Sequence, residues 1–223
     1  MPQFSPRVVI AAGLAGTMAV AVPMALTASG STPNYPADKA TFTSGKTVIA
    51  DPGLPGASAP VEVLSAKMRT SAPADLELSL TSECTILSNI TNMGNDTQGY
   101  STTVKLWVTV DGTPVSVVPG PTTTGASSGG GASDDGKVVF CNREFTRSTA
   151  FDSQNESIQD IETTEQANAF NWVAPNVGNG IHDIQVFAEF DNTNQGDATS
   201  HGVITRRSLT INVTNYAVNQ PSA

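Results

Sequence analysis

The sequence predicts an all-β protein built as an antiparallel β-sandwich. Three observations lead to this fold class. Apolar and polar residues alternate in several segments, which is typical of strands with one buried face. An Asp-Gly pair stands between two apolar runs, the strongest short signal of a hairpin. The only two cysteines lie on either side of this hairpin and suit a single disulfide.

Two strands are predicted before the first polar loop. Residues 61–69 form the first one. In the second, the leucines of L-E-L-S-L at residues 76–80 alternate with polar residues, and the same phase continues through Cys84 and Ile86. Because the leucines form the apolar face, Cys84 is expected to point into the core.

The central hairpin begins with a strand at residues 102–110. It places Val104, Leu106 and Val108 on one face and Trp107 on the other. The pair Asp111-Gly112 then predicts a type I′ turn, which requires positive φ at both central residues. Trp107 is expected to pack on a second, smaller cluster, with a role as a contact residue as the alternative.

The strand pattern resumes after a Gly-rich segment at residues 119–136. Strands are predicted at residues 137–145, 168–174 and 184–190, followed by a last strand that ends at Val213. This gives about eight strands with sandwich-like spacing.

One short helix or acidic loop is expected near residues 152–165. Asp152, Glu156 and Asp160 recur at every fourth position, while Ile158 and Ile161 could face the body of the protein. Three carboxylates on one face also admit acid–base chemistry, but a solvated helical face or an acidic loop is favoured.

The chain divides into four parts. Residues 1–30 have one positive charge and an apolar run from Val8 to Leu26, which predicts a secretory signal peptide. An uncleaved anchor is the alternative, because about 19 apolar residues can span a bilayer. The proline-rich residues 31–60 are expected to form an extended lead-in or linker, residues 61–215 the sandwich domain, and residues 216–223 a disordered tail.

The net charge of −9 bears on possible partners. An acidic chain with 11 Lys and Arg residues is poorly suited to nucleic acid, whose binding depends on neutralised phosphates. It also lacks basic clusters for anionic membranes once the signal is cleaved. We therefore expect a secreted protein, extracellular or associated with the cell surface, with an extracellular or cell-wall partner.

Cys84 and Cys141 are interpreted as a structural disulfide, because the segment before them predicts export. Closing a loop of nearly 60 residues stabilises a fold by roughly 4 kcal/mol. A metal pair would need two more ligands, and neither His182 nor His201 has metal-site spacing to a cysteine.

No catalytic motif is found. A serine hydrolase would need an elbow such as G-x-S-x-G, which does not occur. His182, next to Asp183, is interpreted as a structural corner histidine whose ring bonds to the backbone. The prediction is therefore a protein that is not an enzyme and needs no cofactor.

Calcium is the one metal that the sequence suggests. The segment Asp191–Asp197 carries oxygen-bearing side chains at Asp191, Thr193, Gln195 and Asp197. Its sixth residue is a glycine, as in the pattern D-x-[DN]-x-[DN]-G. The bidentate Glu of that pattern is missing, since Gly202 stands at the twelfth position. A polar hairpin loop explains the same residues without an ion.

Four strings carry a resemblance to known proteins. V-K-L-W-V-T-V-D-G-T-P-V, V-V-F-C-N-R-E-F, A-N-A-F-N-W-V-A and G-I-H-D-I-Q-V-F-A, in this order, resemble uncharacterised exported β-rich proteins of actinobacteria over roughly Cys84 to Val213. The resemblance implies secretion, a paired cysteine and a β-rich body. A looser likeness is to immunoglobulin-like sandwich modules, with His182 near the position of a corner tyrosine.

The resulting hypothesis is a secreted, non-catalytic module of the extracellular space or cell envelope. The expected contacts are the loops at residues 92–99, 119–136 and 191–197, because loops on a rigid scaffold often carry binding. The alternative is a structural subunit of an extracellular assembly formed by strand-edge pairing. A secreted hydrolase is the third hypothesis.

Overall fold

The computed structural model describes residues 37–51, 53, 55–117, 134–150 and 156–214. Contacts along the chain separate residues 1–35 from a second unit that runs from Pro36 to Ala223. The first unit, which includes the predicted signal segment, lies outside the described residues. No helix in the described ranges is long and apolar enough to cross a membrane.

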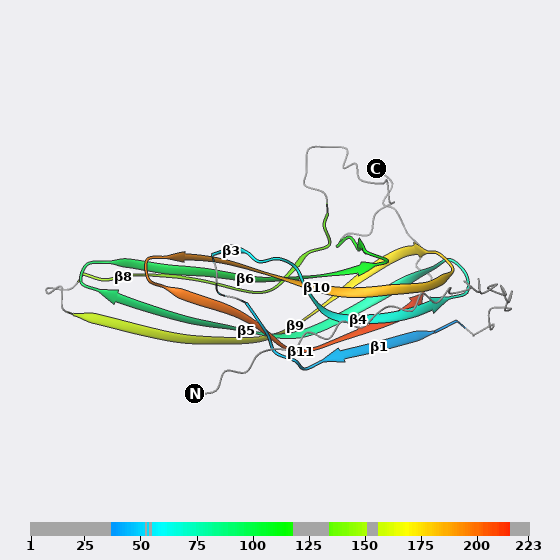
Figure 1. The fold of residues 1–223 in the computed structure, drawn as a ribbon, viewed down its shortest axis with the longest axis horizontal. Coiled ribbons are helices and arrows are strands. Elements are labelled where there is room, and N and C mark those ends of the chain that lie inside the picture. The colour runs from blue at the N-terminus through cyan, green and yellow to red at the C-terminus, as the bar shows by residue number, and fades with distance from the viewer. Residues whose placement is uncertain (1–36, 52, 54, 118–133, 151–155, 215–223) are drawn as a thin grey trace, which may run out of the picture. The chain divides into compact units, whose positions relative to one another are not determined.

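The described residues form two antiparallel sheets that lie as two layers (Figure 1). Sheet A contains β1 (Ala40–Gly45), β2 (Ile49–Ala50), β5 (Ala74–Met93), β9 (Ser157–Val177) and β11 (Thr199–Thr214). Sheet B contains β3 (Gly56–Ala57), β4 (Val61–Thr70), β6 (Thr97–Val110), β7 (Thr113–Pro114), β8 (Val138–Ser148) and β10 (Gly180–Gln195). The predicted all-β antiparallel sandwich is confirmed.

The strand order is that of a jelly roll. Sheet A reads β1-β11-β5-β9, and sheet B has β10 between β4 and β6, with β8 on the far side of β6. Counted among the eight long strands, these orders are first–eighth–third–sixth and second–seventh–fourth–fifth. Two such sheets built from eight strands define a jelly roll. The likeness to immunoglobulin modules therefore extends to the general architecture and not to the strand order.

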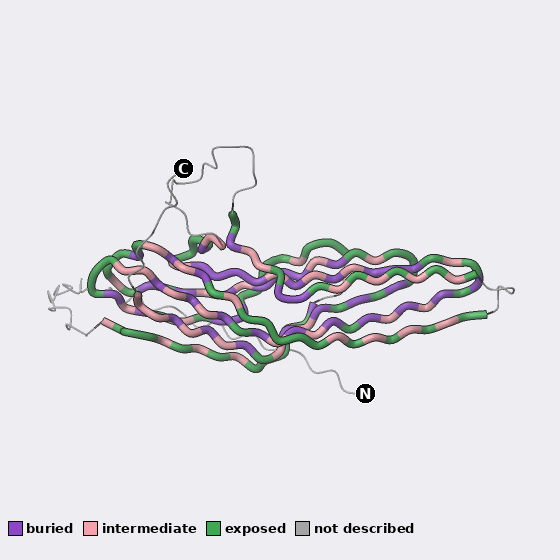
Figure 2. Tube along the Cα trace, turned by 180° about the vertical axis from the view of Figure 1, so that it is seen from behind, coloured by how far each residue is buried: buried purple, intermediate pink, exposed green. Residues whose placement is uncertain are grey.

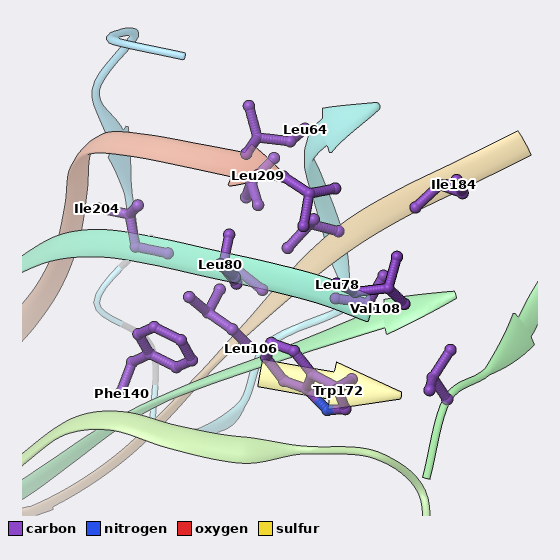
Figure 3. Close-up of a cluster of buried hydrophobic side chains, with 14 of the residues drawn as sticks. Leu64, Leu78, Leu80, Leu106, Val108, Phe140, Trp172, Ile184, Ile204 and Leu209 are labelled. Atoms are coloured by element: carbon purple, nitrogen blue, oxygen red, sulfur yellow. The ribbon is translucent and has the colours of Figure 1, made fainter. Parts of the chain in front are cut away.

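The core lies between the two sheets, where the predicted alternation is confirmed. Burial alternates along the strands in Figure 2, and on β5 the residues Leu76, Leu78 and Leu80 are all buried. Side chains from β6 and β10 meet them from sheet B, including Leu106, Val108 and Ile184 in Figure 3. Trp107, on the outer face of sheet B, packs against Phe187 with ring centroids 5.6 Å apart, so its predicted packing role is confirmed.

The predicted disulfide is present. It joins Cys84 of β5 to Cys141 of β8, with Cα atoms 6.4 Å apart. Because β5 belongs to sheet A and β8 to sheet B, the bond links the two layers directly. Both cysteines are buried among the core residues.

In the lead-in expected at residues 31–60, three described segments pair with strands of the sandwich. β1 pairs with β11 from Ala40 to Gly45, and β2 and β3 add short pairings to β11 and β10. The segment A-T-F-T-S-G has one large apolar residue and stands among prolines, so its strand signal is weak. An edge strand needs only one half-buried face, and pairing with β11 supplies the rest.

The prediction of a short helix or acidic loop near residues 152–165 is wrong for the part of this range that the structure describes. Residues 157–165 belong to β9, which pairs with β5 from Met93 back to Ala74. A spacing of four fits a strand as well as a helix, because four is also a multiple of two. Pairing with β5 holds these residues in an extended strand and not in a helix. Asp152 lies outside the described residues.

Candidate functional site

Three of the four calcium candidates lie along one strand and not around a common point. Asp191, Thr193 and Gln195 lie on β10 itself and not in a loop, and alternate strand residues are about 6.6 Å apart. The carboxylate of Asp191 forms an ion pair with Lys105, with 3.3 Å between Oδ2 and Nζ. Ca²⁺ requires six to eight oxygens within about 2.6 Å, which an extended strand cannot supply. Across the described ranges no three His, Cys, Asp or Glu side chains form a metal-binding group.

The expected contact segments 92–99 and 191–197 are mostly strand residues with short turns, and they come together at one end of the sandwich. The amide of Asp197 donates to Oε1 of Gln98 at 2.9 Å, and Nε2 of Gln98 donates to Asp96 at 2.7 Å. The third loop, at residues 119–136, is described only from residue 134, so most of it lies outside the described residues.

A cavity lies at the opposite end of the sandwich from these contact segments, where β5 begins and β9 ends. This turn cavity has a volume of 360 Å³ and is formed by the turn after β6 and the turn between β9 and β10. Its walls include the apolar side chains of Val115, Pro175 and Val177 and the polar side chains of Asp111, Asn176 and His182. A mostly apolar wall with few polar groups is typical of small-molecule sites.

Backbone conformations of both turns point to the same cavity. Asp111 has a φ of 51° and Gly112 a φ of 78°, which confirms the predicted type I′ turn. Among the described residues, the non-glycine residues with positive φ are Asp111 and Asn176, and both line the turn cavity. Such conformations persist where the surroundings hold them, and they concentrate at binding and catalytic sites.

His182 connects two turns and the end of β4 at the wall of this cavity. It is 7% exposed, and its Nδ1 donates to Oδ2 of Asp111 at 2.7 Å. Its Nε2 lies 3.0 Å from the carbonyl of Gly178 and 3.1 Å from Oγ1 of Thr70. The hydroxyl of Thr70 in turn donates to the carbonyl of Gly178. The predicted bond from the ring to the backbone is confirmed.

The order carboxylate, imidazole, hydroxyl resembles that of a hydrolase triad, but the bonding differs. In a triad, Nε2 accepts the proton of the nucleophilic hydroxyl. Here the hydroxyl of Thr70 is committed to Gly178, and Nε2 contacts the same carbonyl, which is only an acceptor. Thr70 is 3% exposed, so its hydroxyl is not open to a substrate. Both nitrogens of the imidazole are held in structural contacts within the protein.

Asp111 is the charged group that a ligand in the cavity would meet. Its side chain is 53% exposed, compared with 9% for that of His182. The hydrogen bond from His182 holds the pKa of Asp111 below its ordinary value, with a smaller contribution from the amide of Asp183. The carboxylate thus stays ionised and has lone pairs left for a hydrogen-bond donor.

A broader hollow of 680 Å³ crosses sheet A near the bulge in β11. Small side chains such as Ser44, Ser82 and Ala167 line it. Lys46, Arg206 and Glu83 also line it, and Arg206 pairs with Glu83 at 3.4 Å. We prefer the turn cavity because hydrogen bonds fix its polar groups beside an apolar wall.

Sequence reasoning identified parts of the site without joining them. It singled out Asp111 as a turn residue and His182 as a corner histidine, but not their bond, and it missed Thr70 and Asn176. The contact between Asp111 and His182 spans 71 residues, and no local pattern reports it. His201 lies on β11 in the other sheet, exposed and beside Gly53.

Comparisons with known proteins add little. No protein-family model matches the chain, and no curated protein does. Among solved structures, the chain is similar to that of infectious bursal disease virus Gx strain, at 10% identity over 82% of this chain and 38% of that chain, with a TM-score of 0.26. The Gt strain of the same virus gives 12% identity over 82% and 38% of the two chains, with a TM-score of 0.29. The chain spans less than half the length of these virus chains, and at such TM-scores the likeness carries no argument.

Proposed function

We propose that this protein is an exported, non-catalytic binding module whose ligand occupies the turn cavity. The observation that carries the proposal is the combination found there: a cavity of 360 Å³, a half-exposed Asp111, and an imidazole whose two nitrogens both contact groups of the protein. The ligand is a small organic group that presents a hydrogen-bond donor to Asp111 and an apolar surface to Val115 and Pro175.

Export is supported by the disulfide. A buried bond between Cys84 and Cys141 is stable in oxidising surroundings and rare in a reducing cytosol. The apolar leading segment and the resemblance to exported proteins of actinobacteria agree with this location. Fractionation of producing cells tests it: we expect the mature protein outside the cytoplasm, and a reduced cytoplasmic protein would contradict export.

A binding role is favoured over catalysis because the lowered pKa of Asp111 makes its carboxylate a weak base, and the imidazole of His182 is held by contacts within the protein. General-base catalysis requires a nitrogen or carboxylate that can take a proton from the substrate. Nε2 of His182 faces a carbonyl, and Thr70 is buried behind it. The hydrolase hypothesis therefore lacks a reactive hydroxyl at this site.

The binding site is tested by titrating the ¹⁵N-labelled protein with butylamine, butanol and butyrate as separate probes. We expect amide shifts at residues 110–116 and 173–178, strongest for the probes that donate a hydrogen bond. Ser116→Phe, which places a ring in the cavity, should abolish these shifts. Thr193→Phe, an exposed change on β10 at the other end, is the matched control. If the Ser116→Phe variant binds all three probes as the parent protein does, the turn cavity is not the binding site.

The second candidate is a subunit of an extracellular assembly. One observation favours it: β9 runs for 21 residues and pairs on one side only, with β5. Its other edge has no strand partner among the residues that the structure describes.

A further inference from the structure

The outer edge of β9 has the features of a strand that binds another strand. β9 is the last strand of sheet A, so one row of its backbone N–H and C=O groups has no partner strand within the described chain. Unpaired edges of this kind are templates for β-augmentation. From residue 165 to residue 169, five consecutive side chains are exposed, so no described side chain covers this part of the edge.

An exposed apolar side chain lies next to this edge. Ile161 is 72% exposed, the highest value among the large hydrophobic residues described as exposed. It stands on the outer face of sheet A, opposite Asn89 of β5, and Leu87 beside it is 42% exposed. Isolated exposed aliphatic residues are common, but one at a free strand edge is in position to pack against an added strand.

The charges of β9 are divided unevenly along its length. Asp160, Glu162 and Glu165 all lie in its first half, whereas residues 168–177 carry no charge. Arg147 pairs with Asp160, and Arg143 pairs with Glu162, both across the gap from β8 of the other sheet. Asp160 and Glu162 thus each have one cationic partner within the protein, and the negative charge of β9 stays confined to its first half.

We propose that a second copy of this protein binds at the β9 edge, with the two β9 strands antiparallel about a two-fold axis near Ala167. Sheet A of one copy then continues into sheet A of the other. A two-fold axis makes the contact self-complementary and closes it at two copies. The inference does not rest on the proposed ligand, and it gives the assembly hypothesis a defined interface.

The position of the axis follows from the charge division. An axis at Glu162 would place that carboxylate against its own copy, and like charges directly opposite each other destabilise strand pairs. An axis at Ala167 places Glu165 opposite Ala169 and the acidic half of each strand opposite the uncharged half of the other. It also places Ile161 opposite Val173, and both lie on the outer face of their strands.

The first test is the mass of the full chain in solution, measured by sedimentation from about 1 µM to about 1 mM, the range that spans weak and moderate association. We expect a monomer–dimer equilibrium. Ile161→Lys adds a charge at the apolar contact and should weaken association at least about tenfold. Ile181→Lys on β10, where the parent residue is 64% exposed, is the matched control and should leave association unchanged.

The second test locates the axis. Directly opposite residues of antiparallel strands have Cβ atoms about 5 Å apart, so Ala167→Cys should form a covalent dimer under oxidising conditions. Thr193→Cys on β10 should not. A monomer at every concentration, a dimer that Ile161→Lys does not weaken, or open-ended filaments in place of a closed dimer would each overturn the proposal.

Discussion

Nδ1 of His182 donates a hydrogen bond to Oδ2 of Asp111 at 2.7 Å, and this bond fixes the turn after β6 to the start of β10. The amide of Asp183 adds a second bond to the same carboxylate at 2.9 Å. Asp111 thus joins two loops that are distant in the sequence, and it does so at the wall of the turn cavity. The bond organises the site and also contributes to stability.

The lowered pKa of Asp111 predicts a pH-dependent contribution to stability. Because the folded-state pKa lies below the ordinary value of 3.8, the stabilisation is complete above that value and is lost as the pH falls through the lowered folded-state pKa. Asp111→Asn should reduce the free energy of unfolding by about 1 kcal/mol at neutral pH, a modest figure because the side chain is half exposed.

Urea unfolding of both proteins at neutral pH and near pH 3 checks this prediction. The difference between them should shrink in acid. Asp183→Asn is the control: its carboxylate pairs with Lys67 at 2.9 Å on the surface, where both side chains are more than half exposed, so it should have little effect at either pH. A stability difference for Asp111→Asn that is the same at both pH values would show that the ionised carboxylate of Asp111 does not stabilise the fold.

The disulfide predicts a large effect of reduction. Cys84 and Cys141 are 57 residues apart and join the two sheets. The double variant Cys84→Ala, Cys141→Ala should be less stable than the oxidised protein by about 4 kcal/mol. Equilibrium unfolding with and without a reductant measures this. The reductant should have no effect on the double variant, and equal stability of oxidised and reduced parent protein would show that the bond contributes nothing.

Ion pairs between β8 of sheet B and β9 of sheet A are expected to stabilise the contact between these two sheets. Arg143 pairs with Glu162, and its Nε also donates to the hydroxyl of Tyr100 at 2.9 Å. A double-mutant cycle with Arg143→Met and Glu162→Gln should give a coupling energy of about 1 kcal/mol, because both side chains are about two-thirds buried.

The same cycle on Lys67 and Asp183, an exposed pair on sheet B, should give a coupling near zero. Equal coupling in the two cycles would mean that burial between the sheet edges does not strengthen the Arg143–Glu162 pair.

How much of this fold can be read from the sequence depends on whether the signal is local. Alternation along Leu76, Leu78 and Leu80 predicts β5, and the Asp111-Gly112 pair predicts the turn, because side-chain direction and backbone φ are properties of neighbouring residues. The disulfide is predictable because only two cysteines exist. These features do not depend on which strands become neighbours.

The remainder depends on contacts between distant segments. β1 is recognisable as a strand only through β11, and the first half of β9 is kept from a helix only by its pairing with β5. The jelly-roll order requires each strand to choose a partner far along the chain, which no spacing of residues encodes. The bond from His182 to Asp111 is of the same kind, so the candidate site becomes visible only in three dimensions.

A crystal structure of the protein soaked with butylamine would show whether the turn cavity is a binding site. We expect the probe to lie in this cavity, with its nitrogen within hydrogen-bond distance of Asp111 and its alkyl chain against Val115 and Pro175. Crystals of Ser116→Phe should lack the probe. A probe bound only in the broad groove across sheet A, or an empty turn cavity at saturating probe, would contradict the assignment of this cavity as the binding site.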